Sequence, residues 1–218
     1  MGWTEFCIAF VAFFLSHSVP VHPPVRGALV GLLGQRGFTI GYSALSLAVL
    51  SWLIGAAGRA PYFPLWQWAP WQNYVVLVAM GLACLLLALG AVRPNPFSFG
   101  GTGNDRFNPA DPGIILLHRH PLLLALALWA FAHVLPNGDV AHVILFGLFG
   151  SFALLGQIII DRRKKRQMGT EWDMLWSQSR QAPFRFTTLS PMRVCAGALL
   201  YGLLLWLHPT LFGVSPLQ

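Results

Sequence analysis

The sequence contains little charge and little cysteine. Only 10% of its 218 residues are charged, whereas 56% are hydrophobic. Soluble globular domains carry about 25% charged residues, so this composition excludes an ordinary soluble protein and indicates an integral membrane protein. The three cysteines, Cys7, Cys84 and Cys195, stand in three different apolar segments and form no Cys-x-x-Cys pair. Neither a disulfide framework nor a structural zinc site is therefore indicated.

Acidic residues are also scarce, at 7 against 14 basic ones. The resulting net charge of +7 could suggest a nucleic-acid partner. However, the basic residues lie in connections between apolar segments, where membrane topology accounts for them, so we expect no nucleic acid. No basic residue precedes the first apolar run, and we therefore expect no cleaved signal peptide.

Long apolar runs dominate the rest of the chain. Six of them approach the length that a helix needs to cross a bilayer: Trp3–Val19, Phe38–Ala57, Tyr74–Val92, Ile114–Leu135, Val140–Ile160 and Val194–Leu211. The runs are continuous rather than alternating, which favours helices over barrel strands. The sequence predicts an all-α, polytopic bundle of six transmembrane helices, forming one domain over residues 1–218 in a lipid bilayer.

The basic residues also predict an orientation. Every Lys and Arg except Arg59 falls in the connections after the first, third and fifth runs, when Arg119 near the beginning of the fourth run is counted with the third connection. The positive-inside rule then places these connections in the cytoplasm and both termini outside it. The first part of one such connection, residues 95–113, is rich in Pro, Gly, Asn and Asp and leads directly to His118. Because long irregular loops are often functional, we expect this loop to act as a lid over a site.

Ionisable residues interrupt the fourth run. His118, Arg119 and His120 stand near its beginning and His133 near its end. Such residues are costly at membrane depth and mark candidate functional sites. Residues 121–135 alone would reach only about 22 Å of the roughly 30 Å hydrocarbon core. We therefore expect the helix to begin at Ile114, which would place the three residues 118–120 at the cytoplasmic edge.

Depth in the membrane sorts the histidines into two sets. The inner set is His17, His22, His118 and His120, and the outer set is His133, His142 and His208. Two histidines from different helices at one depth can supply the axial ligands of a haem. His17 and His120 are the candidate pair, with Arg26 and Arg119 placed to bind the propionates. Alternatively, each histidine is an interfacial side chain or a hydrogen-bond donor to a neighbouring helix.

A turn follows the fourth run. Pro136-Asn137-Gly138-Asp139 predicts positive φ angles at Asn-Gly and an N-terminal cap on the next helix from Asp139. The fourth and fifth runs should therefore form a tight antiparallel hairpin. His118, His133, Asn137 and Asp139 are secondary candidates for the site, and the interpretation of the turn is mainly structural.

Four groups of residues give the chain a family resemblance. They are Ser16-His17-Ser18-Val19-Pro20-Val21, Gly58-Arg59-Ala60-Pro61-Tyr62, Arg119-His120-Pro121, and Leu128-Trp129-Ala130 with His133 and Asn137-Gly138-Asp139. Together these residues resemble the NnrU family, which consists of small bacterial inner-membrane proteins named for genes near denitrification functions. The resemblance implies a multi-pass protein of the bacterial inner membrane. It also implies a role in nitrogen-oxide metabolism, either as an enzyme or as an accessory factor.

NnrU proteins are related to 15-cis-zeta-carotene isomerase. That enzyme is a membrane protein that binds haem b through histidines and isomerises a cis double bond when the iron is reduced. The relationship implies haem b as the cofactor, with His17 and His120 as iron ligands. It further implies cis-trans isomerase activity on a hydrophobic, isoprenoid-like molecule. Val19–Pro24 differs from the small-residue run found in that enzyme, so the substrate itself stays open.

Two alternatives remain. The chain is also similar to isoprenylcysteine carboxyl methyltransferases, which carry Arg-His-Pro before a late span and then an acidic, proline-containing tail. Glu171, Asp173, Leu175 and Pro183-Phe184-Arg185 are the corresponding residues here, and they would imply S-adenosylmethionine as the methyl donor. The second alternative is a non-enzymatic membrane assembly or transport factor, in which Arg162–Arg166 recruits a protein partner.

Overall fold

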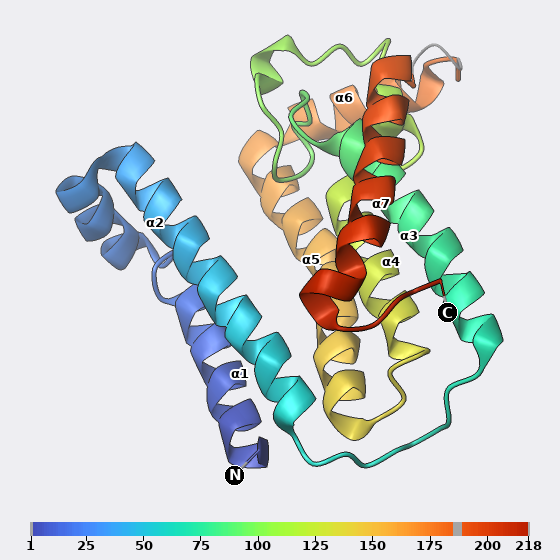
Figure 1. Cartoon of the computed structure of the whole chain (residues 1–218). Coiled ribbons are helices and arrows are strands. Elements are labelled where there is room, and N and C mark those ends of the chain that lie inside the picture. Colours follow the sequence, from blue (N-terminus) through green and yellow to red (C-terminus); the bar gives the residue numbers. More distant parts are fainter. Residues whose placement is uncertain (1, 185–188, 218) are drawn as a thin grey trace. The chain divides into compact units, whose positions relative to one another are not determined.

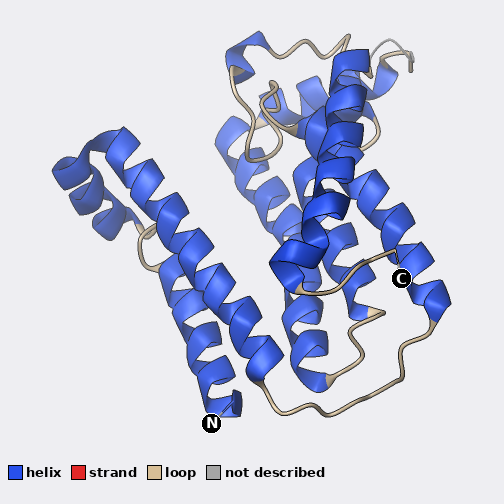
Figure 2. Ribbon diagram, viewed as in Figure 1, coloured by secondary structure: helices blue, strands red, loops and turns tan. Residues whose placement is uncertain are grey.

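The computed structural model describes residues 2–184 and 189–217, and this part of the chain is helical (Figures 1 and 2). The helices are α1 (Gly2–Ser18), α2 (Pro23–Arg59), α3 (Pro70–Gly90), α4 (Pro121–Val134), α5 (Val140–Met168), α6 (Thr170–Gln181) and α7 (Pro191–Phe212). Two short 3-10 helices, η1 (Asn104–Arg106) and η2 (Gly113–Leu116), lie between α3 and α4. The predicted all-α class is confirmed for the described residues.

In the described part of the chain, four helices are long and apolar enough to cross a membrane, namely α2, α3, α5 and α7. The remaining two predicted spans correspond to shorter helices, with 17 residues in α1 and 14 in α4. The membrane character of the chain is thus confirmed, with four candidate spans in place of six.

The expected helix over Ile114–Leu135 is wrong in its first third. The α-helix begins only at Pro121, and Ile114 belongs to η2. His120 has φ −118° and ψ 60°, outside the helical region, because the ring of a following proline disfavours helical backbone at the residue before it. Residues 118–120 therefore lie in a short irregular link, where their backbone polar groups can bond to side chains.

The chain divides into two compact units, and the first consists of residues 1–66 and 138–145. Here α1 packs along α2 (Figure 1). An ion pair joins Arg59 Nη2 to Glu5 Oε1 at 2.6 Å, and Trp52 Nε1 donates to the same carboxylate. Gly34, with φ 71°, breaks α2 into a short first part and a long second part. Left-handed backbone of this kind favours glycine.

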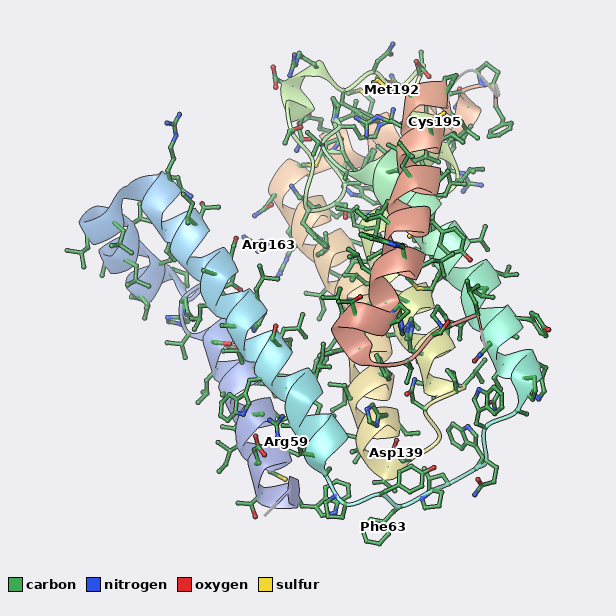
Figure 3. The ribbon with its side chains drawn as sticks, viewed as in Figure 1. Arg59, Phe63, Asp139, Arg163, Met192 and Cys195 are labelled. Atoms are coloured by element: carbon green, nitrogen blue, oxygen red, sulfur yellow. The ribbon has the colours of Figure 1, made fainter. Side chains whose placement is uncertain are left out.

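The beginning of α5 is bonded to the segment that follows α2. Leu65 N–H donates to Gly138 O at 2.7 Å, and Val140 N–H donates to Phe63 O at 3.0 Å. Asp139, labelled in Figure 3, accepts the backbone N–H groups of residues 141 and 142, so its predicted capping role is confirmed. The expected positive φ angles at Asn137 and Gly138 are wrong. Gly138 is instead required by close packing, since a Cβ there would lie 2.6 Å from the Trp66 indole.

The second unit comprises residues 67–137 and 146–218. In it, α3 packs against both α4 and α7. Helices α4 and α5 meet through Leu123, Ala127 and Ala153, in the antiparallel sense expected of a hairpin. A second apolar cluster joins α6 to the loop of residues 91–112, the α3–η2 loop, with buried Leu89, Phe97, Ile114, Ile115 and Trp172. This cluster fixes the loop that carries Ser98 beside the link that carries His120.

Candidate functional site

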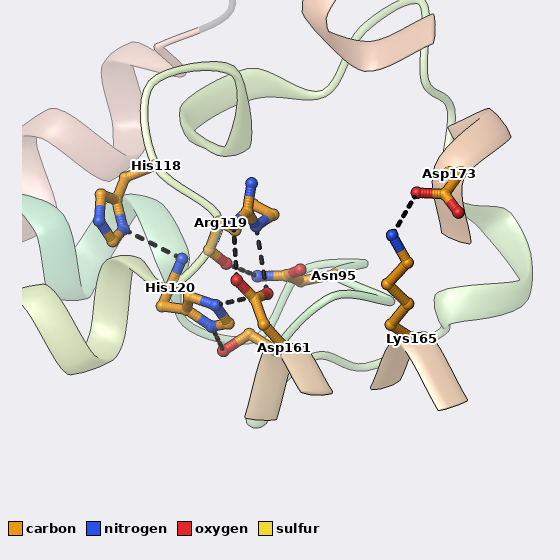
Figure 4. A network of polar contacts seen from close by, with 8 residues as sticks. Asn95, His118, Arg119, His120, Asp161, Lys165 and Asp173 are labelled. Atoms are coloured by element: carbon orange, nitrogen blue, oxygen red, sulfur yellow. Dashed lines mark hydrogen bonds and ion pairs between the residues drawn. The ribbon is translucent and has the colours of Figure 1, made fainter. Parts of the chain in front are cut away.

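His120 is bonded at both ring nitrogens (Figure 4). Its Nε2 lies 3.0 Å from Oδ1 of Asp161, on α5. Its Nδ1 lies 2.9 Å from the hydroxyl of Ser98, in the α3–η2 loop. The side chain is only 2% exposed. Three segments that are distant in the sequence thus meet at one imidazole.

Arg119 holds the same carboxylate. Its Nε and Nη2 donate to the two oxygens of Asp161 at 3.2 and 2.5 Å. The guanidinium also lies over two rings of α6, 4.4 Å from the centroid of Trp176 and 5.3 Å from that of Trp172. A two-pronged arginine–carboxylate pair that is also stacked on aromatic rings has a fixed geometry. Asp161 is therefore held in place between a cation and an imidazole.

The α3–η2 loop is also hydrogen-bonded to the link that carries Arg119 and His120. Asn95 Nδ2 donates to the carbonyl of Arg119 at 2.9 Å, and Asn95 Oδ1 accepts the N–H of Phe97 at 3.1 Å. Phe97 packs edge-on against both tryptophans of α6. Its ring centroid lies 5.9 Å from that of Trp172 and 5.6 Å from that of Trp176. The loop predicted to cover a site thus does contact His120 and Arg119; its action as a lid stays a prediction.

His118 and His120 are connected through the backbone of the link. The N–H of His120 donates to Nδ1 of His118 at 3.1 Å. Burial lowers the pKa of His120, and the Asp161 carboxylate only partly opposes this. Burial and the neighbouring Arg119 lower the pKa of His118 as well. Both imidazoles are therefore neutral near pH 7.

Because both pKa values are lowered, stability should fall on acidification. The unfolded chain takes up protons near the ordinary histidine pKa of 6.5, while the folded chain resists them to lower pH. The stability difference is thus fully present above that pH and is lost as the pH falls below it. We expect the midpoint of thermal unfolding in detergent to drop between about pH 7.5 and about pH 5.5. His120→Gln should flatten this slope, because the buried imidazole is then absent. An equal slope in wild type and His120→Gln would contradict the lowered pKa of His120.

The outer candidates have structural partners. His133 Nδ1 donates to the carbonyl of Trp129 at 2.7 Å, and Asn137 Nδ2 donates to the carbonyl of His133 at 2.7 Å. The Asp139 carboxylate, besides capping α5, lies 2.6 Å from Nδ1 of His142. These bonds fix the ends of α4 and α5, which agrees with the mainly structural interpretation of the turn.

His17 differs from His120 in its bonding. Its Nδ1 lies 2.8 Å from the carbonyl of Phe13, one turn earlier in α1. Because a carbonyl only accepts, Nδ1 carries a proton, and in the neutral imidazole Nε2 then carries the lone pair. Arg26 is exposed and donates to Gln35 at 3.2 Å. His17 belongs to the first unit and His120 to the second, so their pairing at one haem stays a prediction.

The two predicted iron ligands fit a haem unequally. A histidine that binds a metal usually donates its other N–H to a carbonyl or carboxylate, as Nδ1 of His17 does. His120 has no free nitrogen in this arrangement, since Ser98 and Asp161 take both. Two nitrogens of Arg119 are likewise committed to Asp161. Among the described residues, no three His, Cys, Asp or Glu side chains are grouped to hold a metal ion.

A family model described as NnrU protein matches residues 5–216. The chain belongs to the NnrU family. No curated protein and no solved structure matches it. Family membership names no reaction, so the chemistry of this NnrU protein has to be inferred from its residues.

Two residues of the cluster were missed by sequence reasoning. In the sequence, Asp161 stands between the fifth apolar run and the basic run Arg162–Arg166, and Ser98 is one residue of the polar loop 95–113. One signal was present for Asp161: it is an acidic residue directly after the fifth apolar run, at the same predicted depth as Arg119 and His120. No sequence signal distinguished Ser98, because its role depends on the path of the loop.

Proposed function

We propose that this NnrU family member is a haem b-binding membrane protein that acts as an isomerase on a hydrophobic, isoprenoid-like molecule. The observation that carries the proposal is the bond between His17 Nδ1 and the Phe13 carbonyl, which leaves Nε2 prepared to bind iron. A bound haem would supply an iron whose oxidation state gates the reaction. In an accessory role in nitrogen-oxide metabolism, His17 would bind the haem in the same way, but the protein would convert no substrate.

The chain's own residues have separate tasks in this proposal. His17 provides the ligand nitrogen and is oriented by Phe13, whose ring centroid lies 4.1 Å from that of the imidazole. His120 is oriented by Asp161 and Ser98. In this proposal it acts as a neutral acid–base group. Ligation by His120 would require it to leave Asp161 first, so we assign the ligand role to His17.

An absorption spectrum tests the assignment. The protein is purified after expression with a haem supply, and oxidised and reduced spectra are recorded for wild type, His17→Ala and His120→Ala. We expect a Soret band in the wild type and in His120→Ala, and its loss in His17→Ala. His22→Ala is the matched control, since His22 is an exposed histidine close to His17 in the sequence. Absence of a Soret band in the wild type would refute haem binding, and a low-spin to high-spin change in His120→Ala would restore His120 as a ligand.

A methyltransferase function is the second candidate, and one contact favours it. Helix α6, which carries Glu171 and Asp173, packs Trp172 against the Arg119 of Arg-His-Pro. The methyltransferase-like motif and tail are therefore in contact, although Arg185 lies outside the described residues. Calorimetry with S-adenosylmethionine should then show binding that Glu171→Gln weakens. If neither haem nor S-adenosylmethionine binds, the non-enzymatic assembly or transport role is the one that remains.

A further inference from the structure

We propose that Ser98, His120 and Asp161 form a nucleophile, base and orienting acid for acyl transfer from a carboxylic ester with an apolar acyl chain. This activity goes beyond the proposed haem function and does not depend on it. It follows from the hydrogen-bond polarity of the cluster, from its fixed carboxylate and from its apolar surroundings.

The polarity of the hydrogen bonds is settled by the partners. Ionised Asp161 has only acceptor oxygens, so the Nε2 of His120 must carry the proton in their 3.0 Å bond. In a neutral imidazole the other nitrogen, Nδ1, then carries the lone pair. The Ser98 hydroxyl at 2.9 Å must therefore donate to Nδ1. This is the direction in which a histidine activates a serine, with the two ring nitrogens exchanged relative to the usual order.

A second serine–histidine pair in the chain shows that proximity is not enough. Ser16 Oγ lies 3.2 Å from Nδ1 of His17. That nitrogen donates its proton to the carbonyl of Phe13, so it has no lone pair for the serine. The Ser16 hydroxyl bonds to the same carbonyl at 3.0 Å. Ser16 is thus a matched control for Ser98.

The Asp161 carboxylate is held in a fixed position. Arg119 binds both oxygens of Asp161, which keeps the Oδ1 atom fixed beside Nε2 of His120. When the imidazole accepts a proton, the charge develops next to this carboxylate and is stabilised by it. Ser98 is 3% exposed and His120 2%, so water screens the interaction only from the side of Asp161, which is 25% exposed.

The residues packed around Ser98 are apolar, and this is why we assign an apolar acyl chain to the ester. Ser98 directly follows Phe97, whose side chain is buried with Leu89 and Ile115. A Cβ at Gly100, two residues after Ser98, would lie 2.6 Å from the Leu122 side chain. Helix α6 covers Phe97 with Trp172 and Trp176 and is joined to α5 at Gly169, with φ 59°.

The reaction balances without an oxidant or reductant. Ser98 Oγ attacks the carbonyl carbon of the ester and forms a C–O bond, while its proton moves to Nδ1 of His120. The bond from that carbon to the alcohol oxygen breaks, and His120 returns the proton to the departing alkoxide. Water then repeats both steps on the acyl-serine, which releases the carboxylic acid and restores the hydroxyl.

Covalent labelling tests whether Ser98 is a nucleophile activated by His120 and Asp161. The full-length protein in detergent is treated with two alkyl fluorophosphonates, one short and one long, and the modified peptide is mapped by mass spectrometry. We expect one adduct, on Ser98, absent in Ser98→Ala and unchanged in Ser16→Ala. His120→Gln and Asp161→Asn should slow labelling by about 10²–10⁴-fold. In Asp161→Asn the pH profile of labelling should also move to lower pH, because the carboxylate no longer stabilises the imidazolium; a purely structural role would leave the profile in place.

Three results would overturn the proposal: no adduct on Ser98 with either reagent, an equal rate in His120→Gln, or an unshifted pH profile in Asp161→Asn. Ser179→Ala removes another buried serine of the same unit, one that bonds only to a helix carbonyl, and it should leave both the fold and the labelling unchanged. The Soret band is recorded on the same samples. Failure of the acyl-transfer proposal is thereby distinguished from failure of haem binding.

Discussion

Asp161→Ala should lower the free energy of unfolding by about 2–4 kcal/mol. The substitution removes the partner of two groups at once, since Arg119 and His120 both bond to this carboxylate. Removing one member of a buried ion pair is costly because the other charge stays behind without compensation. Asp161 is 25% exposed rather than fully buried, so the expected loss is smaller than the loss of about 3–5 kcal/mol typical of fully buried pairs. Denaturant titration in mixed micelles measures it.

Asp173→Ala is the matched control. This carboxylate also pairs with a cation, Lys165, at 2.9 Å, but the two side chains are 55% and 58% exposed. Exposed ion pairs contribute about 0–1 kcal/mol, because water screens them and both side chains must be ordered. Equal losses for the two variants would show that the Asp161 cluster does not stabilise the fold as its geometry indicates.

Much of the fold was predictable from apolar runs alone. Lipid demands that backbone polar groups bond within a segment, so long continuous runs become helices. The ends of α1 and α3 consequently lie within a few residues of the predicted limits. The cap at Asp139 was also predictable, because its cause is local: a short carboxylate at the first turn of a helix.

The run that begins at Ile114 misled the prediction because apolar character does not identify what covers a residue. Ile114 and Ile115 are buried by protein, in a cluster with Phe97 and Trp172, rather than by lipid. Pro121 gave the opposing signal, since the residue before a proline avoids helical backbone. Weighing that signal over the length of the run would have placed the beginning of α4 correctly.

The candidate site was predictable only in part. His120 and Arg119 could be found because ionisable residues are conspicuous in an apolar run. The partners of His120 are distant in the sequence: Asp161 lies 41 positions after it, and Ser98 lies 22 positions before it. Such contacts depend on how the helices and the loop pack, which no local pattern encodes. The depth argument likewise gave no information about the ring nitrogens, and these decide the chemistry of each histidine.

Gly90→Ala should destabilise the protein by about 1–3 kcal/mol and disturb His120 as well. Gly90 is the last residue of α3 and is buried against the start of α4. A Cβ there would lie 2.5 Å from Cγ and 2.8 Å from Cβ of Pro121. The proline ring cannot rotate away, so α3 and α4 would have to separate. Since His120 precedes Pro121, its bonds to Ser98 and Asp161 should be distorted. We expect lower stability in denaturant titration together with slower labelling of Ser98.

Gly81→Ala separates this close approach from the general effect of adding a methyl group. Gly81 lies in the same helix, but the nearest atom to its added Cβ would be Cε1 of Tyr201 at 3.9 Å, an ordinary contact. Alanine in a helix interior is favoured over glycine by about 0.5–1 kcal/mol, so this variant should be slightly more stable than wild type. The two substitutions should therefore have opposite signs. If Gly90→Ala were tolerated as well as Gly81→Ala, α3 and Pro121 could not be in the tight contact that positions His120 beside Asp161.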